Sequence, residues 1–199
     1  MKVPFLACLV LAVCLISSGA RADEAADLAA IRALYSKISE GKPTKTETIK
    51  FEVEESVMEG SITRRSYDGG LSAIKLSYSA GDHGGSEQSY YYDGKGLFLI
   101  LVQDSSWYFV EGGTAEKPKT ADTLTETRYY VKGGAIIEVL EKSATVTTGD
   151  GKKLEDLIAK AGNKKVEEKK RDPFLLKRAA ALVDMKTKEQ AQKFFAAEE

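Results

Sequence analysis

Apolar residues near the start of the chain recur with the period of an α-helix. They fall at positions i, i+3, i+4 and i+7, namely Ile31, Leu34, Tyr35 and Ile38. Asp23 and Glu24 precede this stripe at the end where negative charge stabilises a helix. Gly41 and Pro43 follow it as stop signals. The pattern predicts one amphipathic helix over residues 23 to about 40.

From Lys45 the period changes to two, which is typical of a half-buried β-strand. Ile49, Phe51 and Val53 alternate with charged residues. Turn signals then recur between short runs of β-branched and aromatic residues, at 67–70, 81–85, 92–96, 104–106 and 132–134. This pattern predicts seven or eight antiparallel strands between Lys45 and Thr148.

One run in this region, Leu97 to Val102, is apolar at every position. A strand of this kind is buried on both of its faces. We therefore expect a central strand at this place, with packed layers on both sides of the sheet.

A second helical stripe follows the strands. Its apolar residues are Leu154, Leu157, Ile158 and Ala161. Asp150 is placed to cap the start of this helix, and residues 162–163 are placed to end it. The charged residues 164–171 are predicted to form a solvated helical turn or a linker.

The last helix is predicted to begin at Asp172-Pro173, since aspartate favours the cap and proline the first turn. Its apolar positions run from Leu175 through Leu182 and on to Phe194 and Phe195. Together the elements predict an α+β fold, an antiparallel β-meander sheet of about seven strands packed with one N-terminal and two C-terminal helices. Residues 23–150 would form the helix and sheet, and residues 151–199 a helical segment packed on the same domain.

The first 22 residues have the layout of a secretory signal peptide. Lys2 precedes the apolar run 3–16, and residues 20–22, Ala-Arg-Ala, form a small-x-small cleavage site. We expect cleavage near Ala22 and a periplasmic or secreted protein. The alternative is a lipoprotein signal that ends at Cys14, although Val13 stands where such signals need a very small residue. The apolar run is shorter than the roughly 20 residues of a membrane-spanning helix, so we expect a chain that does not span the membrane.

Composition narrows the chemistry further. Both cysteines, Cys8 and Cys14, lie inside the predicted signal, so the exported chain has no thiol for a disulfide or a metal site. The single asparagine, Asn163, is not in a glycosylation sequon, which favours a bacterial protein. Residues 23–151 carry 14 basic and 21 acidic side chains, whereas residues 152–199 carry 13 and 9. The basic C-terminal part is a solvated helical surface, docks on the acidic body, or faces an anionic partner.

Three predicted hairpins, at residues 66–71, 91–97 and 129–135, place a tyrosine before a glycine turn and an apolar strand after it. These hairpins resemble the short β-hairpin repeats of MORN-type proteins, and the resemblance implies a meandering sheet with protein or lipid contact. The order of signal, helix, Tyr90–Gly94 hairpin and Glu126–Tyr130 hairpin is similar to that of uncharacterised exported bacterial proteins. This second resemblance implies no activity and no site residues.

Motifs for common catalytic chemistry are incomplete. His83 is the only histidine and lies in a glycine-rich turn, and the sequence contains no Gly-x-Ser-x-Gly elbow. Ser72 and Lys75 have the Ser-x-x-Lys spacing of acylating enzymes, but a strand turns residues three apart to opposite faces. No phosphate-binding glycine loop is present in the sequence. We therefore expect no catalytic residue, no metal site and no cofactor.

Pairs of carboxylates keep a hydrolase open as an alternative. Glu52 with Glu54 would serve a glycosidase only if the fold held the two groups about 5 to 10 Å apart across a cleft. The same condition applies to Asp68 with Asp93. Solvated strand faces and turn-capping aspartates explain the same residues without catalysis.

Aromatic side chains are concentrated between residues 67 and 130. The clusters 90–92, 107–109 and 129–130 place adjacent rings on opposite faces of a strand. If helices cover only one side of the sheet, the other side presents a binding surface made of Tyr90, Tyr92, Trp107, Phe109 and Tyr129. The alternative is ordinary packing by residues that favour strands.

These observations favour a non-enzymatic exported binding or interaction module. Its partner would be an unknown protein or a small hydrophobic ligand, and not a nucleic acid. The first alternative is a carrier of a lipid or other hydrophobic ligand, if the Leu97–Val102 strand lines a cavity. The remaining alternatives are a carboxylate-dependent hydrolase and a purely structural envelope protein.

Overall fold

A computed structural model of the 199-residue chain describes residues 11–54, 58–80, 84–167 and 173–197. The helices are α1 (Leu11–Glu40), α2 (Leu154–Lys160), α3 (Pro173–Asp184) and α4 (Lys188–Ala196). The strands are β1 (Lys45–Val53), β2 (Met58–Ser66), β3 (Ser72–Ala80), β4 (Gly84–Asp93), β5 (Gly96–Val110), β6 (Lys119–Lys132), β7 (Ala135–Thr147) and β8 (Lys164–Lys165). A short 3₁₀ turn, Asp68–Gly70, connects β2 to β3.

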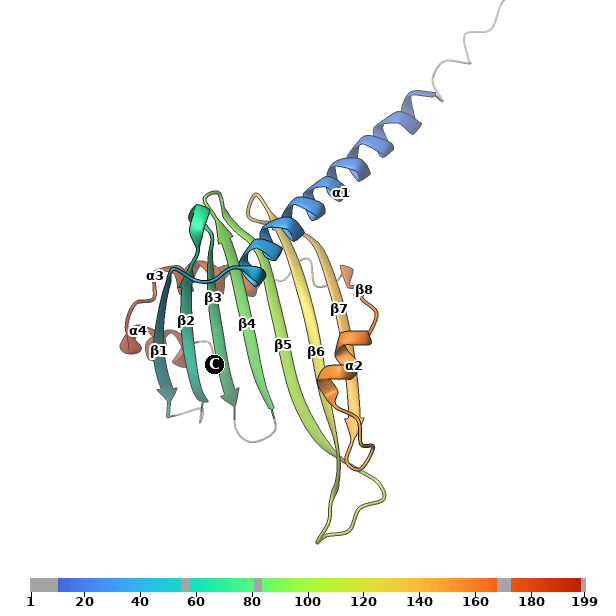
Figure 1. The fold of residues 1–199 in the computed structure, drawn as a ribbon, viewed down its shortest axis with the longest axis vertical. Coiled ribbons are helices and arrows are strands. Elements are labelled where there is room, and N and C mark those ends of the chain that lie inside the picture. Colours follow the sequence, from blue (N-terminus) through green and yellow to red (C-terminus); the bar gives the residue numbers. More distant parts are fainter. Residues whose placement is uncertain (1–10, 55–57, 81–83, 168–172, 198–199) are drawn as a thin grey trace, which may run out of the picture.

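The strands form one antiparallel sheet in which each strand pairs with the next one along the chain, from β1 to β8 (Figure 1). The predicted α+β fold with an antiparallel meander is therefore confirmed. Seven strands come from the region whose sequence has period two. The eighth corrects the prediction of a helical turn or linker, because Lys165 pairs with Leu140 of β7 and its ammonium group contacts the buried Glu138.

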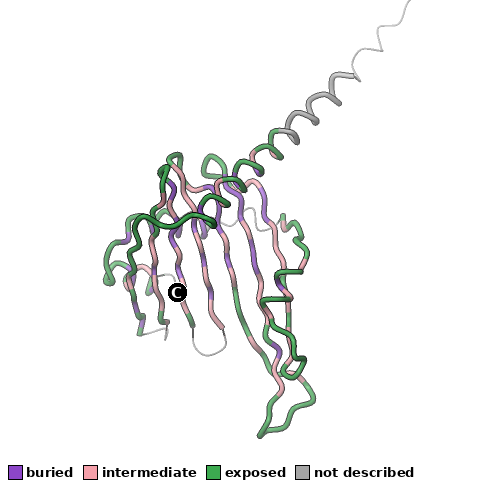
Figure 2. The backbone as a smooth tube through the Cα atoms, viewed as in Figure 1, coloured by how far each residue is buried: buried purple, intermediate pink, exposed green. Residues whose placement is uncertain are grey.

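Helices lie on both faces of the sheet (Figure 1). The α3 face is covered by α3 and α4, and the opposite face, which we call the α1 face, carries α1 and α2. The sheet has one core of buried side chains on each side, and β5 contributes to both, with Ile100 toward α3 and Leu99 toward α1. Buried residues recur along the central strands in Figure 2. The prediction that the Leu97–Val102 run is a central strand with packed layers on both sides is confirmed.

The N-terminal helix ends at Glu40, as predicted, and begins at Leu11 within the predicted signal. Leu28, Ile31 and Ile38 are buried against the α1 face, as the helical stripe indicates. No helix among the described residues is long and apolar enough to cross a membrane.

Two corrections concern the ends of the C-terminal helices. Lys153, and not Asp150, stands at the N-cap of α2. Asp150 instead accepts a hydrogen bond from the Thr147 amide (3.3 Å) and closes the turn after β7. The predicted last helix is divided into α3 and α4, because a capping box starts a new helix at Thr187. In this capping box the Gln190 amide donates to Thr187 Oγ1 (3.3 Å), and the Thr187 amide donates to Gln190 Oε1 (3.1 Å).

The break between α3 and α4 is held by the sheet below it. The Arg64 guanidinium of β2 donates to the carbonyl oxygens of Leu182 (2.7 Å) and Met185, at the end where a helix has unpaired carbonyls and favours a cation. The change of direction brings α4 back over β1, where Phe195 stacks on Phe51 with ring centroids 4.7 Å apart. The α3 face is thereby closed by two short helices in place of one long helix.

Candidate functional site

The five aromatic residues predicted as one binding surface lie in two separate places. Tyr90 and Tyr129 are buried in the core beneath α3 and α4. The Tyr92 hydroxyl donates to the Ala179 carbonyl of α3 (3.0 Å), so this ring is also beneath that helix. Trp107 and Phe109 lie at the far end of β5, in contact with each other. The predicted surface required one uncovered sheet face, and helices on both faces prevent it.

A buried polar network occupies the α3 face next to Tyr90. The Arg178 guanidinium of α3 donates to Gln88 Oε1 (2.9 Å), and the Tyr90 hydroxyl donates to the same oxygen (2.6 Å). Arg178 also lies over the Phe174 ring, 4.3 Å from its centroid. These groups satisfy one another inside the protein, so the network fixes the position of α3 on the sheet.

The candidate catalytic groups from the sequence are not assembled into a site. Ser72 and Lys75 lie on strand β3, which turns their side chains to opposite faces. Asp93 caps its own hairpin, because its carboxylate accepts from the amides of Lys95 (2.8 Å) and Gly96 (3.1 Å). His83 lies outside the described residues. Among the residues that are described, no three His, Cys, Asp or Glu side chains meet in a group suited to a metal ion.

A cleft lies on the α1 face, where the end of α1 and the following loop cross strands β1 to β4. Its volume is about 640 Å³. Gly41 permits the sharp turn that forms its rim, because a Cβ atom at this position would lie 2.6 Å from the Lys37 carbonyl oxygen. The loop is then fastened to the sheet by the Thr44 amide, which donates to the Ser66 carbonyl (2.8 Å). The cleft is therefore shaped by backbone that is fixed at both ends.

Two rows of cross-strand neighbours make the floor of the cleft. One row contains Thr46, Arg65, Ala73 and Tyr91, and the next contains Thr63, Lys75 and Ser89. Side chains paired in this way lie side by side on the same face of an antiparallel sheet. The register thus gathers two cations, several hydroxyl groups and an aromatic ring from four different strands.

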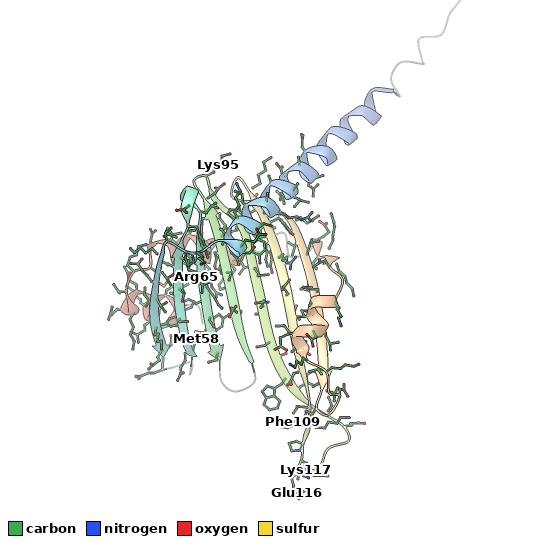
Figure 3. All side chains as sticks on the ribbon, in the orientation of Figure 1. Met58, Arg65, Lys95, Phe109, Glu116 and Lys117 are labelled. Carbon is green, nitrogen blue, oxygen red and sulfur yellow. The ribbon has the colours of Figure 1, made fainter. Side chains whose placement is uncertain are left out.

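The charge of the lining is one-sided. Arg65 and Lys75 are the only charged lining residues, and no carboxylate from the described part of the chain lines the cleft. Lys75 forms an ion pair with Glu87 of β4 (2.6 Å), outside the lining. Arg65 is exposed, and Figure 3 shows it close to the end of α1. Its guanidinium offers planar hydrogen-bond donors that suit a carboxylate or phosphate group.

Tyrosines form the apolar part of the wall. Tyr91 stands edge-on to Tyr35 of α1, with ring centroids 5.2 Å apart, and Tyr67 borders the same space. Burial raises the pKa of Tyr91 to about 12, and the neighbouring Tyr35 phenol adds to the increase. The Tyr91 hydroxyl is therefore a neutral group at physiological pH, able to donate a hydrogen bond.

We expect the free energy of unfolding to decrease in alkaline solution. The stabilisation from a phenol with a raised folded-state pKa is complete below the unfolded value of about 10 and is lost as the pH rises through the folded value. For Tyr91 the window extends from about pH 10 to the folded pKa of about 12. Urea unfolding measured between about pH 9 and 11 should show a smaller decrease for Tyr91→Phe than for the unaltered protein. The matched change Tyr108→Phe, at a ring that is 52% exposed, should show the same alkaline decrease in the free energy of unfolding as the unaltered protein. An equal decrease in the Tyr91→Phe and Tyr108→Phe variants would contradict the burial of Tyr91.

Below the cleft the α1 face continues as a polar surface. Glu126 is buried, forms ion pairs with Arg128 (2.6 Å) and Lys142 (3.4 Å), and accepts a hydrogen bond from Gln103 (3.3 Å). Because each of these groups already has an internal partner, this cluster stabilises the sheet.

Sequence patterns did not single out Arg65, and they drew attention to Lys75 only through its Ser-x-x-Lys spacing with Ser72, not as a binding residue. The adjacent pair Arg64-Arg65 does indicate that each face of the sheet carries one arginine, because neighbouring residues of a strand point to opposite faces. The pattern does not say which strands lie beside β2 or where α1 crosses the sheet. No family model, curated protein or solved structure matches this chain.

Proposed function

We propose that the protein is an exported, non-enzymatic binding module that takes a small anionic ligand in the cleft beneath α1. The observation that carries this proposal is the one-sided charge of the lining, which contains Arg65 and Lys75 but no carboxylate from the described residues, although Lys75 is also paired with Glu87 beside the cleft. Two cations from adjacent strands attract one anionic group, and Arg65 can bind it through two parallel hydrogen bonds.

The shape of the cleft supports a ligand that also has an apolar or aromatic body. A volume of about 640 Å³ lies within the range of sites for small molecules. The rings of Tyr35, Tyr67 and Tyr91 supply flat apolar surface, and their hydroxyl groups supply hydrogen bonds. We therefore expect an organic carboxylate, phosphate or sulfonate that carries a ring.

This proposal is favoured over a carrier of a wholly hydrophobic ligand. A carrier requires an apolar chamber, and in the sequence the Leu97–Val102 strand was the candidate to line one. Its side chains instead pack into the two cores, Ile100 on the α3 face and Leu99 on the α1 face. A separate space of about 390 Å³ borders Leu97 and Phe98, but its lining includes the charged residues Asp27, Lys95 and Lys132, so it is not a wholly apolar chamber.

Two fluorescent dyes test the proposal. The probes are anilinonaphthalene sulfonate, which is anionic and aromatic, and phenylnaphthylamine, its neutral counterpart. In the double variant Arg65→Gln/Lys75→Gln we expect the affinity for the sulfonate to decrease about tenfold, since two partly exposed charges are lost. Binding of the neutral dye should change little.

Lys188→Gln is the matched control, because it removes an exposed lysine from α4 on the opposite face. Its sulfonate affinity should equal that of the unaltered protein. An unchanged sulfonate affinity in the Arg65/Lys75 variant would contradict the proposed site, as would an equal loss for both dyes.

A further inference from the structure

The two cations of the cleft differ in what balances their charge. Lys75 of β3 forms an ion pair with Glu87 of β4 at 2.6 Å, and 34% and 40% of the two side chains are exposed. Arg65 of β2 is also exposed, and no described residue forms an ion pair with its guanidinium. A ligand can therefore bind Arg65 without breaking an ion pair, whereas at Lys75 it competes with Glu87.

Strand register brings the two cations close enough to bind one group. Arg65 is paired with Ala73, which lies two residues before Lys75 on β3. Arg65 and Lys75 are therefore diagonal neighbours on the same face of the sheet. Diagonal neighbours have Cβ atoms roughly 7 to 8 Å apart, a distance that long side chains can span. Both side chains can thus contact the same anionic group from different sides.

The hydrogen-bond donors at this place are more numerous than the oxygens of a carboxylate. A carboxylate has a planar pair of oxygens, and Arg65 can bind both through parallel hydrogen bonds. A phosphate or sulfonate group has a further oxygen, which can accept from Lys75. The hydroxyl groups of Thr46 and Ser89 are cross-strand neighbours of Arg65 and Lys75 and offer additional donors. The cleft therefore suits a group with three terminal oxygens.

Glu87 sets how much negative charge the ligand needs. When Lys75 moves from Glu87 to a ligand with a single charge, one partly exposed ion pair replaces another, and the net gain is small. A phosphate monoester carries a charge of about −1.5 to −2 at pH 7, so it attracts Lys75 more strongly than the Glu87 carboxylate does. A monoanion gains mainly the contact with Arg65.

We propose that the cleft selects phosphate monoesters that carry a ring, and that Glu87 sets this selectivity. The selectivity requires the anion-binding function proposed above and adds the chemical class of the anion. Arg65 binds two oxygens of the phosphate and Lys75 binds the third, while the ring lies against the tyrosines of the wall. Glu87 is a positioning residue, because it lies outside the lining and acts through Lys75.

Three ligands with the same phenyl ring separate the effect of charge from the effect of oxygen number. Phenyl phosphate has three terminal oxygens and nearly two charges, benzenesulfonate has three oxygens and one charge, and benzoate has two oxygens and one charge. Their affinities for protein expressed from the full sequence are measured by isothermal titration calorimetry at one ionic strength. We expect phenyl phosphate to bind about tenfold more tightly than either monoanion.

Inorganic phosphate distinguishes an organic ester from the free ion. It has no ring to lie against the tyrosines, so it should bind more weakly than phenyl phosphate. Equal affinities for the two would overturn the proposed monoester and identify free phosphate as the ligand.

Variants of the ion pair test the origin of the selectivity. Lys75→Gln should lower the affinity for phenyl phosphate about tenfold and that for benzenesulfonate much less. Glu87→Gln releases Lys75, so the affinity for benzenesulfonate should rise about threefold and the preference for phosphate should decrease. A merely structural role would change both affinities alike and leave their ratio unaltered. Lys188→Gln, which removes an exposed lysine from α4 on the opposite face, should leave both affinities unaltered.

The outcomes separate this selectivity from anion binding itself. Equal affinities for phenyl phosphate and benzenesulfonate, both weakened by Arg65→Gln, would overturn the selectivity but leave an anion site in the cleft. A preference for phosphate that persists in both Lys75→Gln and Glu87→Gln would also overturn it. If none of the phenyl ligands binds, or if Arg65→Gln weakens none of them, the anion-binding function is overturned as well.

Discussion

Phe51→Ala is expected to lower the free energy of unfolding by about 3 to 5 kcal/mol, the usual cost of removing a buried aromatic ring. Phe51 is 1% exposed and stacks on Phe195 of α4. Its ring also fills the space above Gly60, where a Cβ atom would lie 2.4 Å from Phe51 Cζ. Since glycine has no side chain to move into the gap, the cavity will remain open. Urea unfolding followed by circular dichroism measures the loss.

The same substitution at an exposed phenylalanine is the control. Phe109 is 63% exposed, so Phe109→Ala should change the free energy of unfolding by no more than about 0.5 kcal/mol. A loss below about 1 kcal/mol for Phe51→Ala would mean that α4 does not pack on β1 as described.

The second large effect is expected at the buried carboxylate of β6. Glu126→Gln keeps the shape of the side chain but removes the charge that faces Arg128 (2.6 Å) and Lys142 (3.4 Å). Lys142 has only 11% of its side chain exposed, so water cannot replace the lost partner fully. We expect a loss of about 2 to 4 kcal/mol in the free energy of unfolding, measured in urea.

An exposed ion pair on the same face is the comparison. Glu87 contacts Lys75 at 2.6 Å, but 40% and 34% of the two side chains are exposed. Glu87→Gln should therefore cost at most about 1 kcal/mol. Equal losses at the two positions would show that burial does not strengthen the Glu126 cluster.

The periodicity of apolar residues in the sequence was sufficient to predict the main helix and the strands of the sheet. The change from period 3.6 to period two near Lys45 correctly separates α1 from β1, and the apolar run Leu97–Val102 correctly indicates a strand between two layers. These features are local, because the period of side-chain direction follows from backbone geometry alone. The turn residues also had their expected roles, as the Asp93 carboxylate caps its hairpin.

The ends of the C-terminal helices were predicted less accurately from the sequence. The apolar stripe of the last helix continues through Met185 to Phe195, and this continuity concealed the break at Thr187. A capping box needs only a threonine and a glutamine three residues apart, and many such pairs occur inside helices. Here the carbonyl groups at the break are bound by Arg64, which is 121 residues from Met185 in the chain.

The sequence by itself determined the α+β class, the order of α1, of strands β1 to β7 and of α2, and the amphipathic faces of the strands and of α1, because each depends on neighbours a few residues apart. Only the tertiary structure decided which helices cover each face, that Tyr90 and Tyr129 are core residues, and that Arg65 and Lys75 share a cleft. These outcomes depend on strand register and on where α1 crosses the sheet. Contacts between distant segments set both, through packing of whole surfaces that no local pattern specifies.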